Sequence, residues 1–292
     1  MNKESIENIN LENQAENEIV ASIEGEVCRH SIKGKEGKDP ELTEEGIDKA
    51  LEYYEPKENN MAFGSPKVRA QHTAASKVFG NIAKAPNLAE TKEIIDADLG
   101  YGTHVGVDKR LDFNGDDQSE YGKKFYEAFN NGVYVKFLAE ESDEYAKKVG
   151  DTEGSTCARM AGNIAQIFEK YYKAVDNWAE IVEKDKEKDK PEYNSNTLNR
   201  VLGTHQGVGE SFLIKLIEKT EGIEKRQAFV EAVKNKGFDF NESFKWKINK
   251  LKNGDKTINF SFEKELPNGE VFSFNEEVSK EILDEIVEEG EK

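Results

Sequence analysis

The chain has 292 residues, enough for one large domain with a full hydrophobic core. It carries 41 Lys and Arg against 59 Asp and Glu, a formal net charge of -18. We therefore expect neither nucleic acid nor an anionic membrane surface as the main partner, because both require a basic protein surface. Small anionic ligands remain allowed, since screening over about 8 Å lets a local group of cations outweigh a distant acidic surface.

The N-terminal segment and the cysteines predict a cytoplasmic protein. Residues 1–17 are polar, without the apolar stretch of a secretory signal, and predict a flexible lead-in or an early helix. No apolar run approaches the roughly 20 residues of a membrane span. Cys28 and Cys157 lie far apart and outside metal-binding spacings, so we expect two buried, reduced thiols.

The first third of the chain alternates between strand and helix patterns. Strand patterns at 19–23 and 27–28 end at Arg29 and His30. LTEEGIDKALEYYEP predicts a helix capped by Thr43, and MAFGSPKVRAQHTAASKVFGNI predicts a strand, a turn and a helix. TKEIIDADLGYG is expected to be strand-like and then glycine-rich.

The middle of the chain predicts an insertion followed by a long helix. Residues 108–152 contain helical pieces between loops, and we expect them to form an insertion, or cap, over the main fold. Apolar residues then form one continuous stripe over 157–182, the pattern of an amphipathic helix. The charged run at 183–196 predicts a solvated helix end and loop. TLNRVLGTH predicts a buried strand, and ESFLIKLIEKT a further helix.

Residues 240–292 change character and predict an antiparallel meander followed by a helix. Apolar residues alternate three times, and Asn253-Gly254 and Asn268-Gly269 are turn signals between the repeats. The final helix is expected over 276–288. The predicted fold class is α/β, a three-layer α/β/α single domain over 1–292 with a mainly parallel central sheet. The sequence leaves open whether the meander extends that sheet, forms a dimer surface or covers the substrate.

Polar residues follow the predicted strands. Arg29 and His30 follow the first strand, Arg69 lies in the first helical turn after the second, and His205 precedes a glycine-rich helix start. If these strands are neighbours, the side chains meet at the carboxyl edge of the sheet, where α/β proteins bind ligands. Such a group suits a phosphoryl dianion. Each full charge pair at about 4 Å is worth on the order of 4 kcal/mol at an effective dielectric constant of 20, before desolvation.

These segments resemble the histidine phosphatase superfamily, also called the phosphoglycerate mutase-like family. Its first motif, Arg-His-Gly followed by Leu-Thr-x-x-Gly, is similar to CRHS and LTEEG. Its second, Ser-Pro-x-x-Arg-Ala-x-x-Thr-Ala, is similar to SPKVRAQHTA, and its third, a late Thr/Ser-His-Gly-like turn, to GTHQGVGES. The order and spacing of the motifs agree, and three together are more specific than one.

The resemblance implies phosphomonoester hydrolysis without a metal or cofactor. His30 would attack phosphorus and form a phosphohistidine. Arg29, Arg69 and His205 would hold the phosphoryl oxygens, since the planar guanidinium binds them bidentately. Ser31, which replaces the glycine of the first motif, is a further candidate phosphate ligand.

The resemblance also implies a carboxylic acid that protonates the leaving oxygen and then activates water. In one family branch this acid directly follows the second histidine, where this chain has Gln206. The chain is therefore more similar to the larger branch, whose acid often lies in a Leu-x-Glu-x-x-x-Gly segment. IIDADLG is the nearest match to that segment and nominates Asp96, with Asp98 as the alternative.

Two other functions remain open at this point. A phosphoryl mutase would use the same phosphohistidine, but SIKGK lacks the Glu-Thr-x-x-Asn segment of typical mutases. A non-catalytic binder of phosphorylated ligands would need the cations but no acid. In each case the expected partner is a small phosphorylated molecule, with a homodimer as a further possibility.

Overall fold

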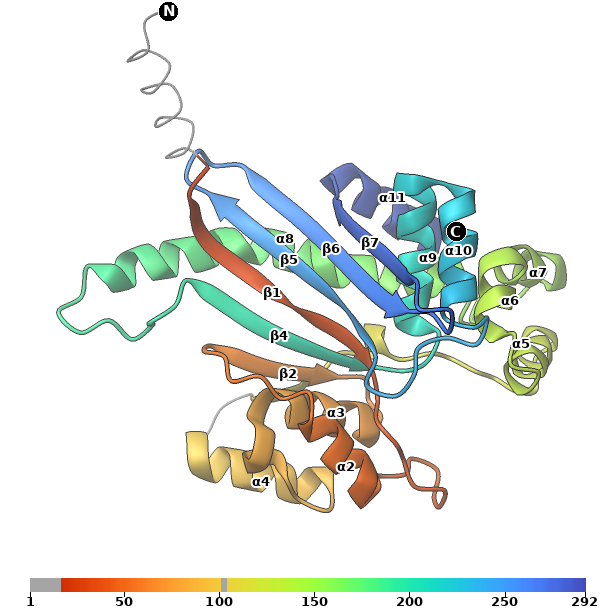
Figure 1. Ribbon diagram of the computed structural model, residues 1–292, viewed down its shortest axis with the longest axis horizontal. Helices are drawn as coiled ribbons and strands as arrows, with labels where there is room; N and C mark the ends of the chain where they lie inside the picture. The colour runs from red at the N-terminus through yellow and green to blue at the C-terminus, as the bar shows by residue number, and fades with distance from the viewer. Residues whose placement is uncertain (1–16, 101–103) are drawn as a thin grey trace, which may run out of the picture.

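A seven-stranded sheet organises the chain in the computed structural model, which describes residues 17–100 and 104–292 (Figure 1). The strand order is β3-β2-β4-β1-β5-β6-β7. The parallel strands are β1 (Ile19–Arg29), β2 (Asn60–Gly64), β3 (Val105–Val107) and β4 (Thr197–Thr204). The antiparallel strands are β5 (Ser243–Leu251), β6 (Lys256–Glu265) and β7 (Val271–Glu277). The predicted α/β class is confirmed, while the expectation for the first 16 residues lies outside the described residues.

Helices cover both faces of the sheet. They are α2 (Glu44–Leu51), α3 (Val68–Phe79), α4 (Leu88–Leu99), α5 (Glu120–Asn130), α6 (Tyr134–Glu140), α7 (Ser142–Val149), α8 (Cys157–Lys186), α9 (Val208–Glu221), α10 (Ile223–Ala232) and α11 (Lys280–Gly290), with short 3-10 turns η1 (Gly80–Ala83) and η2 (Lys109–Leu111). On β4, Val201 packs into the core beneath α3, and the next residue, Leu202, packs into the core beneath α8. Successive strand residues point to opposite faces, so these helices lie on opposite sides of the sheet.

The long helix α8 carries the largest part of the core. Its apolar stripe faces the sheet, and the ring of Phe168 lies 5.0 Å from Phe212 of α9, 5.3 Å from Trp246 of β5 and 4.8 Å from Phe260 of β6. Each such aromatic pair contributes about 0.5–1.5 kcal/mol beyond its buried area. The meander is therefore an extension of the sheet, because β5 pairs with β1 and its apolar side packs on α8.

Several elements differ from the sequence prediction, among them the short strand β3, which was not predicted. Residues 88–99 form α4 instead of a strand, because Asn87 caps the helix by accepting a hydrogen bond from Glu90 N (3.0 Å) and apolar residues at helical spacing are buried. The helix α10 was not predicted. The final helix begins at Lys280, four residues later than expected, because β7 runs to Glu277.

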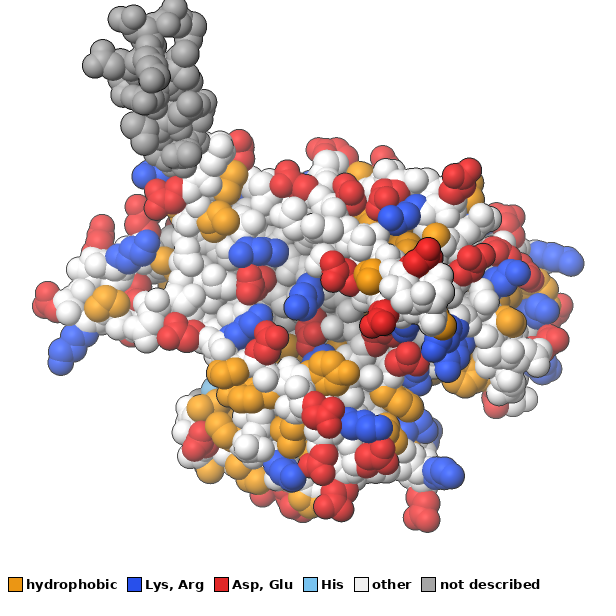
Figure 2. All heavy atoms as spheres, viewed as in Figure 1, with side chains coloured by type: hydrophobic (Ala, Val, Ile, Leu, Met, Phe, Trp, Pro, Cys, Tyr) orange, Lys and Arg blue, Asp and Glu red, His pale blue; other side chains and the backbone are white. Residues whose placement is uncertain are grey.

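The visible face in Figure 2 mixes acidic and basic side chains without one dominant patch. Within the described ranges, no helix combines the length and apolar character needed to cross a membrane.

Candidate active site

The register of β1 and β4 brings the two histidines together. These strands are parallel, with Arg29 opposite Thr204, so the residues that follow them are neighbours at the carboxyl edge. His30 N donates to Thr204 O (2.9 Å), and the rings of His30 and His205 lie 5.3 Å apart. Two residues separated by most of the chain thus share one site.

His30 is a neutral imidazole whose Nε2 carries the lone pair. Its Nδ1 lies 2.6 Å from Ser31 O, and a carbonyl oxygen only accepts, so the proton is on Nδ1 and the lone pair is on Nε2. The ring is 6% exposed. Burial lowers the pKa of His30 to about 2, and the charges of His205, Arg69 and Arg29 act in the same direction. His30 is therefore neutral at physiological pH.

Arg29 is held in place by the loop that precedes β5. Its Nη1 donates to Phe238 O, its guanidinium lies 4.2 Å over the Phe240 ring, and its buried Nε has no partner among the described residues. Glu210 fixes this loop, since its carboxylate accepts from Phe238 N (2.6 Å) and Gly207 N (2.8 Å). Burial raises the pKa of Glu210 to about 7 and lowers the pKa of Arg29, which stays charged.

Arg69 reaches the site from the first turn of α3. This helix lies close to the sheet because β4 has glycine at 203, where a Cβ would stand 2.1 Å from Ala70 O. The Nη1 of Arg69 donates to Asp39 Oδ1 (2.9 Å). Its Nε is buried and has no partner within the described part of the chain, so Arg69 has donor capacity left for an anion.

His205 contacts both a hydroxyl and a carboxylate. Its Nε2 lies 2.7 Å from Ser65 Oγ and 3.3 Å from Asp112 Oδ1, while its Nδ1 is buried without a partner in the described ranges. Burial lowers the pKa of His205. Burial opposes ionisation of Asp112, but His205 and Lys67 outweigh it, so the pKa of Asp112 is lowered. Asp112 is thus an ionised carboxylate beside the second histidine.

Asp112 follows η2 and was missed by the sequence analysis. Asp96 and Asp98, the residues nominated there, lie on α4, whose buried side is formed by other residues. None of the three aspartates is among the lining residues of the cavity described below, but Asp112 contacts His205, which lines it. The sequence carried a weaker signal for Asp112, since LDFNG also combines a leucine, an acidic residue and a glycine. The segment that carries Asp96 and Asp98 is a helix at 88–99 instead of the expected strand.

Ser31 lies next to His30, but its side chain is occupied elsewhere. Its Oγ donates to Gly46 O (2.7 Å) and accepts from Asn241 Nδ2 (3.0 Å), and its N donates to Thr73 Oγ1 (2.9 Å). These bonds tie the loop after β1 to α2, α3 and the approach to β5. The structure therefore gives Ser31 a part in positioning His30, and its hydroxyl does not line the cavity.

A cavity of about 180 Å³ lies between these groups. Its polar lining residues are Arg29, His30, Lys33, Arg69, His205 and Gln206. Its other walls are aromatic and come from residues 113–134 and from Phe240. In the part of the chain that the structure describes, no group of three His, Cys, Asp or Glu side chains is placed to hold a metal ion. The polar floor matches a tetrahedral oxyanion, since it combines two guanidiniums with two imidazoles.

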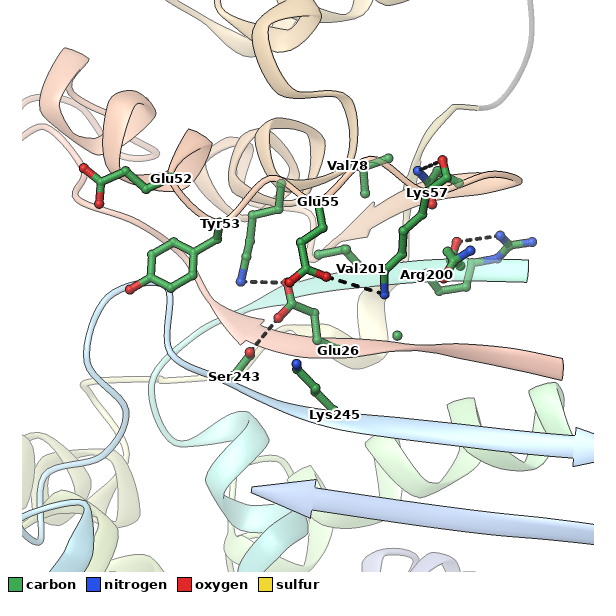
Figure 3. A pocket seen from close by; sticks show the side chains of 14 residues that line it. Glu26, Glu52, Tyr53, Glu55, Lys57, Val78, Arg200, Val201, Ser243 and Lys245 are labelled. Carbon is green, nitrogen blue, oxygen red and sulfur yellow. Dashed lines mark hydrogen bonds and ion pairs between the residues drawn. The ribbon is translucent and has the colours of Figure 1, made fainter. Parts of the chain in front are cut away.

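A larger cavity, of about 390 Å³, lies over the sheet between α3, the loop after α2 and strands β1, β4 and β5 (Figure 3). Two of its lysines are paired with carboxylates. Lys77 Nζ lies 2.6 Å from Glu26 Oε1, and Ser243 Oγ donates to Glu26 Oε2 (2.6 Å). Lys57 lies 3.7 Å from Glu24 and 3.9 Å from Glu55. Its lining residues include no histidine or cysteine, so it lacks the imidazole nucleophile of the smaller cavity.

No family model and no curated protein matches the chain. Among solved structures, it is similar to mycobacterial glucosyl-3-phosphoglycerate phosphatase, with 14% identity, a TM-score of 0.41 and coverage of 78% of this chain and 91% of that one. It is also similar to mycobacterial hydrolase 2, with 13% identity, a TM-score of 0.42 and coverage of 92% and 97%. Because these TM-scores lie below 0.5, the function below is inferred from the cavity residues alone.

Proposed function

We propose that this chain is a metal-independent phosphomonoesterase of the histidine phosphatase type. The observation that carries the proposal is a neutral His30 with a free Nε2, placed between two guanidiniums that keep unpaired, buried donors. The lone pair of His30 provides a nucleophile, and the two guanidiniums provide a site for the charge of a phosphoryl group. The paired charges of the larger cavity provide neither.

In the first step, His30 Nε2 attacks phosphorus, the N–P bond forms and the P–O bond to the alcohol breaks. The guanidiniums of Arg29 and Arg69 hold the phosphoryl oxygens, and His205 donates from Nδ1 once it is protonated. The alcohol oxygen needs a proton, which we assign to Asp112. Asp112 is ionised in the free protein, but a bound phosphoryl dianion raises its pKa by like-charge repulsion, so it binds a proton together with the substrate.

In the second step, water attacks phosphorus and the N–P bond breaks. Asp112, now a carboxylate, takes the proton of that water and is ready to protonate the next leaving oxygen. The sum of the two steps is ester plus water giving alcohol plus phosphate. His30 returns to its neutral form, with its Nδ1 proton held by the Ser31 carbonyl throughout.

Replacement of the nucleophile is the direct test. We expect His30→Ala to lower kcat/KM for an aryl phosphate by about 10⁴-fold or more, because no covalent intermediate forms. The matched control is His104→Gln, since His104 lies outside the cavity. Thermal unfolding checks that both variants fold. Turnover by folded His30→Ala that equals the parent rate would overturn the proposal.

The acid is tested by three neutralising variants. Asp112→Asn should lower kcat/KM by about 10²-fold or more, because general acid–base catalysis typically contributes 10²–10⁴. Asp96→Asn and Asp98→Asn, on α4, should retain the parent rate. The loss should be smaller for a substrate whose leaving group needs no proton, such as p-nitrophenyl phosphate. If an α4 variant lost activity while Asp112→Asn retained it, the acid would be assigned to α4 and not to Asp112.

The same assays separate the two alternatives. A phosphoryl mutase would convert a monophosphorylated substrate into its isomer faster than it releases phosphate. A non-catalytic binder would be stabilised against heating by inorganic phosphate and would hydrolyse no ester. Phosphate release that depends on His30 supports the phosphatase.

A further inference from the structure

The walls of the catalytic cavity are aromatic. Six rings line it: Phe113, Phe125, Tyr126, Phe129, Tyr134 and Phe240. Five of them come from residues 113–134, the segment that joins η2 to α6 and lies beyond the carboxyl ends of β1 and β4 (Figure 1). The part of the cavity that is not occupied by phosphoryl ligands is therefore bounded mainly by ring faces and edges.

This wall begins directly at the catalytic groups. Phe240 lies 6.0 Å from the His30 ring and beneath the Arg29 guanidinium, and Phe113 lies 5.4 Å from the His205 ring. A leaving group attached to a phosphoryl oxygen between the two histidines would therefore meet an aromatic surface at once. Such a surface binds apolar groups without directional bonds.

The wall continues to the cavity mouth. Phe125 lies 4.7 Å from Tyr134, and Phe129 lies 5.7 Å from the same ring. Phe129 is 45% exposed and Phe240 is 40% exposed, so both present apolar surface to water when the cavity is empty. An apolar ligand that covers them removes this surface from water, which is favourable.

Tyr134 adds one polar group inside the wall. The residue is 1% exposed, and its hydroxyl is buried with no hydrogen-bond partner among the residues that the structure describes. A buried hydroxyl without a partner is costly, so a ligand oxygen in the cavity would stabilise it. The wall offers few other polar partners, which disfavours leaving groups with many hydroxyls because their desolvation would not be compensated.

We infer that the phosphomonoester bound here carries a single aromatic ring next to its ester oxygen. This inference rests on the proposed function and names the substrate class of that site. An apolar cavity of about 150 Å³ is known to hold one benzene molecule. The cavity of about 180 Å³ also includes the oxyanion site, so one ring would fill the rest of it up to the mouth at Phe129 and Phe240, and a fused polycyclic group would protrude.

The test compares esters whose leaving alcohols are similar, so that leaving-group acidity does not decide the result. Benzyl phosphate should be hydrolysed with a kcat/KM on the order of 100-fold higher than ethyl phosphate, since burial of the ring adds to binding of the transition state. Phenylphosphonate and methylphosphonate, which are not hydrolysed, should show the same order as inhibitors. Free phosphotyrosine and a phosphotyrosine peptide then distinguish a small-molecule source of the ring from a protein-borne one.

Three variants locate the preference in the wall. Phe129→Ala should reduce the benzyl-to-ethyl ratio about tenfold, because it removes one ring face. Ile181→Ala is the matched control, since Ile181 is also 45% exposed and lies on the outer side of α8. Tyr134→Phe keeps the ring and should keep the ratio. Collapse of the ratio in Tyr134→Phe alone would assign selectivity to the hydroxyl and overturn the role of the rings.

The outcomes separate this inference from the proposed function. Hydrolysis of both esters with a ratio near one, and equal inhibition by both phosphonates, would overturn the aromatic substrate class and leave the phosphatase intact. Failure to hydrolyse either ester, with tighter binding of phenylphosphonate, would overturn the phosphatase and retain the aromatic ligand class.

Discussion

The two cavities described above contain similar charged residues, but they differ in whether these residues are paired. The sheet-face cavity of Figure 3 is about twice as large, yet its Lys77 ammonium and Glu26 carboxylate are in direct contact. In the catalytic cavity, Arg29 and Arg69 keep buried Nε donors without partners in the described chain. Buried polar groups are normally satisfied, and those that are not indicate a missing partner. Between these two cavities, the buried guanidinium donors without a partner, not the volume, distinguish the candidate ligand site.

The largest effect expected from this comparison concerns the cations of the catalytic cavity. Arg29→Met removes a charge that forms no ion pair within the described chain. It should lower kcat/KM by about 10³-fold, the scale of losing a preorganised donor to transition-state charge. Arg200→Met is the matched control, because Arg200 is also buried, lies outside the catalytic cavity and donates from Nη1 to Asn59 O (2.9 Å) and Asn199 O (2.7 Å). Equal loss in both variants would remove the distinction between paired and unpaired arginines.

The sheet-face cavity should respond in stability instead. Glu26→Ala leaves the Lys77 ammonium buried without its carboxylate and should reduce the free energy of unfolding by about 3 kcal/mol. Urea unfolding measures this loss, and hydrolysis by the folded fraction should stay close to the parent rate. The double variant Glu26→Leu/Lys77→Met should recover most of the stability, because no charge is left unpaired. A catalytic defect in Glu26→Ala at unchanged stability would contradict the comparison.

The buried, neutral His30 of the catalytic cavity makes the protein less stable at low pH. Burial lowers the pKa of His30 to about 2, far below the value of the unfolded chain, so between these values the unfolded state binds more protons. The contribution of His30 to the free energy of unfolding is fully present above about pH 6.5. It decreases as the pH falls, by about 2 kcal/mol between pH 7 and pH 5. The variant His30→Gln should lose about 2 kcal/mol less than the parent over this range. Parallel stability curves for the two proteins would exclude a buried, neutral His30.

Much of the catalytic floor could be predicted from the sequence. Arg29, His30 and His205 were each expected at a strand end and Arg69 in the first turn of a helix, because parallel strands that end in polar residues place them at one sheet edge. The meander was also predictable, since its alternating apolar residues and Asn-Gly turns are local signals. The sequence did not say that it pairs with β1, because sheet order depends on long-range packing.

The position of Asp112, to which we assign the acid role, and the aromatic walls could not be predicted in the same way. Asp112 follows a turn whose position depends on Thr204 Oγ1, which donates to Leu111 O (2.6 Å) across the fold. The aromatic residues of 113–134 have helical or irregular spacing, and nothing local shows that their rings face a cavity and not the core. The nomination of Asp96 and Asp98 also depended on a strand that is in fact α4.

The position of β5 has a consequence for synthesis of the protein. The Arg29 backbone is bonded to the segment before β5, since Arg29 N donates to Glu242 O (3.0 Å) and Arg29 O accepts from Asn241 N (3.2 Å). A ribosome releases the chain from the N-terminus onwards, so β1 and its motif emerge long before this segment. A nascent chain therefore holds the nucleophile early but completes its surroundings only after residue 240 has emerged, and premature termination would leave the motif without an assembled pocket.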